Sequence, residues 1–254
     1  MKESPLFLSI ETAGHACSVA LLSGRKTSES RHEVKASYIH AERLLPLIDE
    51  VLEAAGKAPK DLNAIIVSAG PGSYTGLRIG VSTAKGLCHA LRIPLIAMDT
   101  LESLSVQARQ ISTTSWDAIV CVLDARRDEV YTATFAPLSN EWTKVQPTRA
   151  LVIDSTAPLK QLFPDAIQGK NVVVIGDAAQ KTQRLLGEKA SHWTFIEEHP
   201  RAENAGASAD LKFAAKEFED VAYFEPRYLK EFIAGTPKDP LGLRQNSIDT
   251  HPSA

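Results

Sequence analysis

The chain has 254 residues, of which 44% are apolar and 23% are charged, and its formal net charge is −3. That length is enough for one large domain or two moderate ones, and the composition is typical of a globular protein. The charge excludes a global basic field of the kind that draws nucleic acid, although a local basic patch stays possible. The three cysteines lack pairing spacing and no apolar run approaches about 18 residues, so we expect reduced thiols, a cytoplasmic protein and no membrane span.

The first hundred residues predict a sheet that opens with antiparallel strands. Apolar runs predict strands at 6–10 and 16–22, and a turn leads into a third strand that ends near Val34. The 3.6-residue period predicts a helix over 40–55, which Pro46 should kink or delay. The elements expected next are a strand at 62–69, a helix at 76–91, a strand at 93–98 and a helix capped by Asp99 or Thr100 that ends near Arg109.

The second half is typical of a looser α/β region that follows a polar linker at 112–117. Strands at 118–124 and 129–135 flank a charged turn, and the stretch to residue 152 is less regular. The elements expected beyond it are a helix at 157–163, a strand at 171–176, a helix to residue 186, a helix at 204–218 and a short closing element at 224–235. This order predicts a two-lobed, mixed α/β architecture. It differs from a Rossmann fold, because the first strand leads into a hairpin.

The stretch SAGPGSYTGLRIGVSTAKGL, at residues 68–87, joins a buried strand to a helix through a glycine loop. Loop amides and a helix N-terminus can together hold an anion, which makes Gly70, Gly72 and Ser73 candidate phosphate contacts. The spacing fits neither a P-loop nor the G-x-G-x-x-G fingerprint, because Thr75 stands where each motif, counted from Gly70, needs a glycine.

The helix at 76–91 carries small or apolar residues around an arc of about 220°, whereas a surface helix needs a stripe of roughly 100°. Its interior glycines cost helix stability, which indicates close packing. The apolar surface beyond that stripe must be covered either by the rest of this chain or by a partner. The helix at 40–55 also has a wide apolar face. The partner-interface candidates on the two helices are Leu44, Leu45, Ile48, Val51, Leu52, Gly76, Ile79, Gly80, Thr83 and Leu87.

The residue patterns that would carry metal or acyl-transfer chemistry are missing. No two of the seven histidines stand at i,i+3 or i,i+4, and no G-x-S-x-G elbow occurs, so no metal site is expected. Carboxylates do stand at or just after three strand ends, at Glu11, Asp124 and Asp177. Each could coordinate a metal-bound nucleotide or could serve turn or cap chemistry. Three such positions favour an architecture built for nucleotide binding.

The motif AGPGSYTGLRIGVSTAKGL resembles the signature of the bacterial TsaB (YeaZ) family. LSIETAGHACSVALL, ERLLPLIDEVL, VLDARRDEVY and PRYLKEF are similar to the same family, in the same order, over about residues 5–233. The resemblance implies a two-lobed actin/sugar-kinase/Hsp70-like (ASKHA) fold, each lobe a mixed sheet with helices. It implies an N-lobe at 1–100 joined by 223–235, and a C-lobe at 101–222. The Pro-, Gly- and polar-rich tail at 236–254 is expected to be flexible.

The resemblance also implies a function. Family members are described as non-catalytic subunits that dock on the TsaD paralogue, join the TsaE ATPase and support threonylcarbamoyl transfer to adenosine 37 of tRNAs reading ANN codons. Docking uses the two N-lobe helices, so the resemblance implies a heterodimer, a homodimer when isolated, contact with tRNA through the complex, and no cofactor.

The superfamily's nucleotide-binding elements are degraded in this chain, at Glu11-Thr12-Ala13, Asp124-Ala125-Arg126 and Gly176-Asp177. Arg126 stands where close approach to a phosphate needs glycine. The alternative function is an ATP-dependent small-molecule kinase of the same superfamily. The polar face of the helix at 76–91, which holds Arg78, Lys85, His89 and Arg92, either contacts tRNA or is a solvated face. The pattern favours the solvated face.

Overall fold

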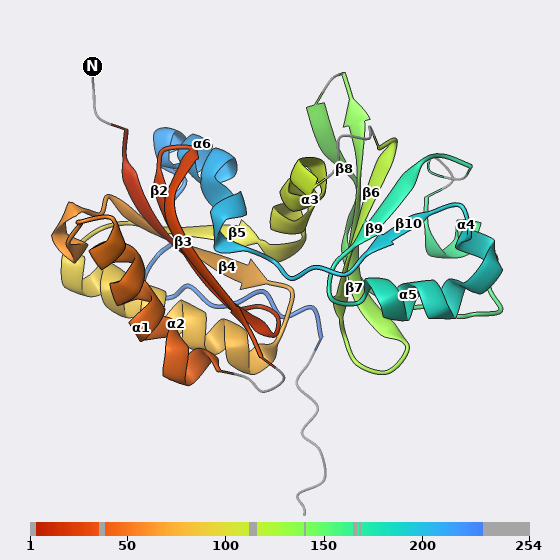
Figure 1. Ribbon diagram of the computed structural model, residues 1–254, viewed down its shortest axis with the longest axis horizontal. Helices are drawn as coiled ribbons and strands as arrows, with labels where there is room; N and C mark the ends of the chain where they lie inside the picture. The colour runs from red at the N-terminus through yellow and green to blue at the C-terminus, as the bar shows by residue number, and fades with distance from the viewer. Residues whose placement is uncertain are drawn as a thin grey trace, which may run out of the picture.

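The computed structural model describes residues 4–35, 39–111, 116–139, 141–164, 167 and 169–230. Its helices and strands form two lobes that stand side by side, each built around one five-stranded sheet (Figure 1). Three expectations fall wholly or partly outside the described residues: the tail at 236–254, positions 112–115 of the linker, and positions 231–235 of the closing element.

The first sheet contains the strand and hairpin that the sequence predicts. Its strands are β1 (Leu6–Glu11), β2 (Ala16–Ser23), β3 (Lys26–Val34), β4 (Ala64–Gly70) and β5 (Leu95–Asp99), in the spatial order β3-β2-β1-β4-β5. β1 pairs antiparallel with β2 and parallel with β4. Helix α1 (His40–Ala54) and the short η1 (Pro59–Asp61) connect β3 to β4, and α2 (Tyr74–Leu91) connects β4 to β5.

The second sheet repeats this topology. Its strands are β6 (Ala118–Asp124), β7 (Glu129–Leu138), β8 (Glu141–Val152), β9 (Val172–Ile175) and β10 (Thr194–Ile196), in the order β10-β9-β6-β7-β8. β6 pairs antiparallel with β7 and parallel with β9, as β1 does with β2 and β4. Two lobes that share this topology have the ASKHA fold that the family resemblance implies.

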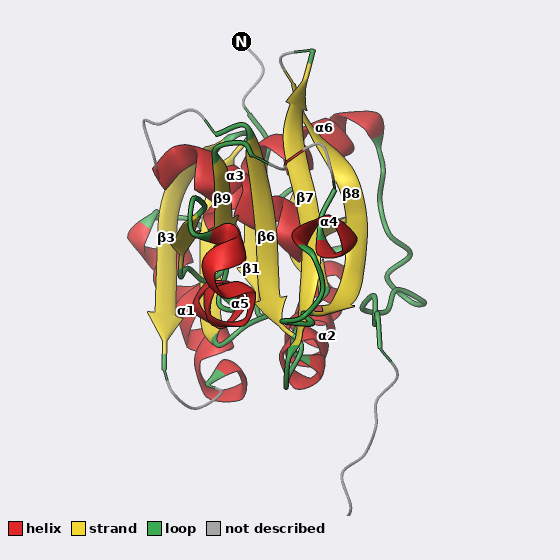
Figure 2. Ribbon diagram, turned by 90° about the vertical axis from the view of Figure 1, so that its right-hand side faces the viewer, coloured by secondary structure: helices red, strands yellow, loops and turns green. Residues whose placement is uncertain are grey.

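Each sheet is covered by helices on both faces, because successive side chains along its strands point to opposite sides. α1 and α2 cover one face of the first sheet, and η4 (Ala202–Ala205) with α6 (Gly206–Ala215) covers the other. On the second sheet, α4 (Leu159–Leu162) and α5 (Ala179–Leu186) cover the face turned to the viewer in Figure 2. α3 (Thr100–Ile111) covers its opposite face. The short η3 (Gly187–Ala190) follows α5.

The last helix of each lobe packs on the other lobe. α3 follows β5 of the first sheet, yet its apolar face joins the core of the second sheet. η4 and α6 follow β10 of the second sheet, yet Ala202, Ala205 and Ala209 pack on the first sheet. Residues 202–215, which we expected within the C-lobe at 101–222, therefore pack with the first lobe. Chain order alone assigns them wrongly, because the chain crosses between the lobes twice.

β8 is the main element that the sequence does not predict, since we expected a less regular stretch up to residue 152. It lies at the edge of its sheet and pairs with β7. From Glu141 to Pro147 its residues alternate between exposed and half-buried, so they form no apolar run. Pro147 is compatible with this strand because an edge strand has backbone groups that need no ladder partner. β10 is also absent from the expected elements, because three residues are too few to show a period.

Two details of the first lobe bear on the expected helix boundaries. α1 begins at His40 and continues through Pro46, so the proline does not delay the helix. Asp99 caps α3 as expected, because its Oδ1 accepts hydrogen bonds from the amides of Leu101 (2.9 Å) and Glu102 (3.1 Å).

Candidate functional site

A cavity of about 710 Å³ lies between the two lobes. The first lobe contributes the β1–β2 turn and the start of α2, the second lobe contributes the β6–β7 turn, and residues 227–230 of the C-terminal segment line it as well. Some predicted nucleotide-site residues line the cavity: Gly72, Ser73, Asp124 and Asp177. The others are buried: Glu11, Thr12 and Gly70. The fold therefore brings the sequence candidates to one region of the molecule.

The glycines of the loop and of α2 allow close approach to the β1–β2 turn of the same chain. A Cβ at Gly72 would lie 2.3 Å from the carbonyl oxygen of Ala13, and one at Gly76 would lie 2.2 Å from that of Thr12. A Cβ at Gly80 would lie 2.2 Å from Thr12 Oγ1. These separations leave no room for a side chain. The close packing that the glycines indicate is thus packing within the chain.

Glu11 ends β1 and is buried. Its Oε1 accepts a hydrogen bond from the amide of Ala13 at 2.7 Å. Burial raises the pKa of this carboxyl to about 7, because water cannot solvate the ionised form. The carboxyl binds the backbone of its own turn, which is the turn chemistry that the sequence leaves open as the alternative to metal coordination.

The β6–β7 turn is held by groups of the second lobe itself. Oδ1 of Asp177 accepts a hydrogen bond from the amide of Asp124 at 2.9 Å, and burial raises the pKa of Asp177. Lys181 of α5 forms an ion pair with Asp124. It also donates to the carbonyl oxygens of Arg127 (3.0 Å) and Glu129 (2.7 Å). The Lys181 ammonium therefore lies among three oxygens of the β6–β7 connection.

The residues at the cleft do not fit the metal-bound nucleotide that the superfamily resemblance would place there. Arg126 and Arg127 have φ angles of 69° and 51°, in the left-handed region that favours glycine. Both residues line the cavity, and Arg126 holds the position at which the superfamily resemblance implies a glycine for close approach to a phosphate. In the part of the chain that the structure describes, no three His, Cys, Asp or Glu side chains gather in a group that could hold a metal ion.

The two helices expected to dock a partner bury most of the predicted interface residues inside this chain. The buried ones pack on the first sheet or on the β1–β2 turn: Leu44, Ile48, Val51, Leu52, Gly76 and Gly80. The chain's own elements cover these six residues, and their role as partner contacts stays a prediction. Four remain at least partly accessible, and we name them the outer helix face: Leu45, Ile79, Thr83 and Leu87. Leu45 is 58% exposed.

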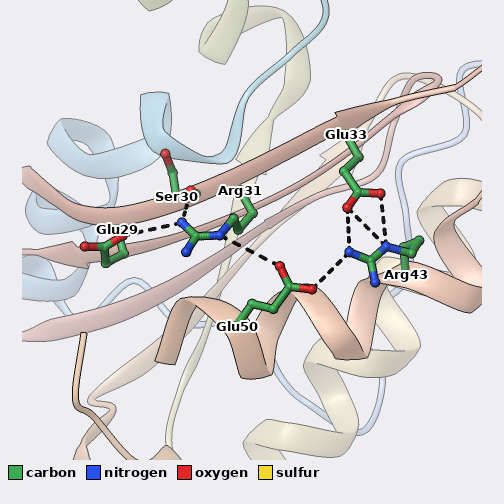
Figure 3. Close-up of polar contacts among 6 residues, drawn as sticks. All are labelled: Glu29, Ser30, Arg31, Glu33, Arg43 and Glu50. Carbon is green, nitrogen blue, oxygen red and sulfur yellow. Dashed lines mark hydrogen bonds and ion pairs between the residues drawn. The ribbon is translucent and has the colours of Figure 1, made fainter. Parts of the chain in front are cut away.

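An ion-pair network ties α1 to the edge strand β3 (Figure 3). Nε of Arg43 donates to both carboxylate oxygens of Glu33, at 3.1 and 3.0 Å, and Nη2 donates to Glu50 at 3.0 Å. Arg31 lies 3.8 Å from the second oxygen of Glu50 and 3.4 Å from Glu29. The guanidinium of Arg43 lowers the pKa of Glu33. This network was not predicted, although the charges of Glu29, Arg31 and Glu33 alternate along β3.

The basic face of α2 holds the C-terminal segment. Arg78 lies over the ring of Tyr74, 4.2 Å from its centroid, and donates to the hydroxyl of Tyr228 at 3.3 Å. Lys85 donates to the carbonyl oxygens of Ala222 and Phe224. Arg78 and Lys85, which we expected on a solvated face, therefore bind the C-terminal segment.

These observations define the class of the protein. Two lobes of one topology face a cleft, and Asp124 and Asp177, which line it, are bound by a lysine and an amide of the same chain. The chain therefore has the ASKHA fold. Across the described ranges, none of the helices has the length and apolar character needed to span a lipid bilayer.

Comparison with known proteins identifies the family. The family model described as TsaD, tRNA N6-adenosine threonylcarbamoyltransferase, matches residues 32–238. The tRNA threonylcarbamoyladenosine biosynthesis protein TsaB of Bacillus subtilis is 31% identical over 237 residues, which cover 88% of this chain and 93% of that protein. The TsaB protein of Escherichia coli is 36% identical over 129 residues, 50% of this chain and 54% of that protein. The structure of YeaZ from Pseudomonas aeruginosa has a TM-score of 0.72 and 27% identity, covering 89% of this chain and 100% of that chain.

The chain belongs to the TsaB (YeaZ) family, as its motifs predict, and it carries the domain that the TsaD model describes.

Proposed function

We propose that this chain is a non-catalytic subunit that supports threonylcarbamoyl transfer to adenosine 37 of tRNAs reading ANN codons. The observation that carries this proposal is the pairing of Lys181 with Asp124, because it neutralises the cleft carboxylate that a metal-bound nucleotide would need. Arg126 and Arg127 add bulk at the same turn. A cleft arranged in this way favours a binding subunit over an enzyme that transfers phosphoryl groups.

The partner is a TsaD paralogue, and the docking surface is the outer helix face. Leu45 stands out at 58% exposure on a helix whose other leucines are buried. Exposed apolar groups of this kind are typical of interaction sites when they lie together. The TsaE ATPase joins the pair in a larger complex, and tRNA is reached through that complex. The same face pairs two copies of this chain when no TsaD paralogue is present.

Reconstitution of tRNA modification tests the proposal. The TsaD paralogue, the ATPase, threonylcarbamoyl-adenylate and an unmodified tRNA are incubated with and without this chain, and the modified nucleoside is quantified by mass spectrometry after digestion. We expect modification to depend on this chain and to survive the substitution Asp124→Asn in it. Equal modification without the chain would contradict the proposal.

The kinase alternative makes the opposite prediction for the isolated chain. A kinase of this fold would bind ATP and Mg²⁺ with micromolar affinity, measurable by calorimetry, and Asp124→Asn would abolish that binding. We expect no heat of binding above dilution for either protein, because Lys181 already holds the carboxylate.

A further inference from the structure

The C-terminal segment at residues 221–230 begins on the first lobe and is bound to it up to Arg227. Lys85 on α2 donates to the carbonyl oxygens of Ala222 (3.1 Å) and Phe224 (3.0 Å), and Phe224 packs against the core under α1 and α2. The amide of Arg227 then donates to the carbonyl oxygen of Ala69, near the end of β4, at 2.7 Å. In Figure 1 this blue segment runs beneath the first sheet and ends between the lobes.

The glycine loop is shaped to receive this segment. Gly70 has a φ of 107°, and a Cβ there would lie 3.0 Å from the carbonyl oxygen of Arg227. The ring of Tyr228 lies 4.8 Å from that of Tyr74, and its hydroxyl accepts a hydrogen bond from Arg78. The loop that resembles a phosphate site at sequence level therefore contacts a peptide of the same chain.

The segment crosses to the second lobe at Lys230. The Lys230 ammonium donates to the carbonyl oxygen of Ala125, in the β6–β7 turn, at 3.3 Å and forms an ion pair with Glu129 at the start of β7. Arg227 and Lys230 both line the cavity between the lobes. A span of a few residues is thus attached to one lobe at Arg227 and to the other at Lys230.

We infer that residues 221–230 form an interlobe strap that holds the cleft closed and that opens at its second-lobe end. The first-lobe end rests on a backbone hydrogen bond, a lysine that binds two carbonyls, and a packed ring. The second-lobe end rests on the contacts of Lys230, whose side chain is 36% exposed, with that of Glu129 22% exposed. Ion pairs with this exposure are weak and are screened by salt. The Lys230 end is therefore the one that releases, and the lobes then separate about the α3 and η4 crossovers.

A distance measurement between the lobes tests the strap in the isolated full chain. Spin labels are attached at Ser82→Cys on α2 and Gln183→Cys on α5, which are exposed, whereas the native cysteines are buried. We expect Lys230→Met to lengthen and broaden the distance distribution measured by pulsed electron resonance. Lys189→Met is the matched control, because Lys189 binds the carbonyls of Ser155 and Ala157 within the second lobe and should leave the distribution unchanged.

Hydrogen exchange at the Arg227 amide distinguishes release of the second-lobe end of the strap from release of its first-lobe end. Lys230→Met should leave this amide protected, whereas Lys85→Met should speed its exchange by about tenfold or more, as expected when a charged hydrogen bond is lost. High salt should move the wild-type distribution toward that of Lys230→Met. A Lys230→Met distribution that matches the wild type would overturn the inference. No partner is present in these experiments, so their failure would leave the proposed function untouched.

Discussion

Gly76 packs directly against the carbonyl oxygen of Thr12, so closely that a Cβ at Gly76 would lie 2.2 Å from it. Alanine is the better helix former, yet here it would force the helix away from the turn. We expect Gly76→Ala to lower the free energy of unfolding by about 1–3 kcal/mol, as overpacking does. Denaturation in urea measures the change.

Gly86, in the same helix, is the control. A Cβ there meets nothing within 4 Å, and the residue is exposed. Gly86→Ala should raise the free energy of unfolding by about 0.5–1 kcal/mol through helix propensity alone. Stabilisation of both alanine variants would contradict the close packing of α2 against the β1–β2 turn at Gly76.

Lys181→Met tests the internal cation of the second lobe. The variant keeps most of the apolar side chain and removes the charge that binds Asp124 and two carbonyls. Because the Asp124 side chain is 51% exposed and water can replace the lysine in part, we expect a loss of about 1–2 kcal/mol in the free energy of unfolding. Lys170→Met, at an exposed position, should change it by less than about 0.5 kcal/mol.

The buried carboxyl of Glu11 predicts a pH dependence of stability. It titrates near pH 7 in the folded chain, against an ordinary value of 4.5. Between these values the folded chain binds more protons than the unfolded chain, so the free energy of unfolding falls as the pH rises through this window.

Glu11→Gln isolates this contribution because it keeps an acceptor oxygen for the Ala13 amide and does not titrate. Between pH 4.5 and pH 8 the wild-type chain should lose about 1–3 kcal/mol relative to the variant. Urea denaturation of both proteins at a series of pH values checks this. A constant difference across the series would show that the carboxyl is not desolvated.

Leu45→Glu tests the docking surface on α1. It should weaken binding to the TsaD paralogue by about tenfold or more, because it places a charge in an apolar contact. Leu211→Glu on α6 is matched to it, since Leu211 is 60% exposed and α6 covers the opposite face of the first sheet. Calorimetry compares the two variants, and equal affinities would place the docking surface elsewhere.

Local pattern predicted most strands and helices, including β6 and the hairpin of β1 and β2, because apolar runs and the 3.6-residue period reflect burial of one face. It did not predict β8, whose edge position leaves it without an apolar run. The lobe bounds implied by the family resemblance put η4 and α6 in the C-lobe, although they pack on the first sheet. Neither error could be avoided from local signals, because both depend on which sheet a segment meets.

For the candidate site, too, some features could be predicted from the sequence and others only from the tertiary structure. Glycines in α2 required a close neighbour, and the sequence by itself determined that requirement together with the family motifs. Only the tertiary structure decided that the neighbour is Thr12 of the same chain, that Leu44 is core whereas Leu45 is surface, and that the loop at Gly70 receives the strap. The physical reason is that a periodic pattern records which side of an element is apolar, whereas the group that covers it is set by contacts between residues distant in the chain.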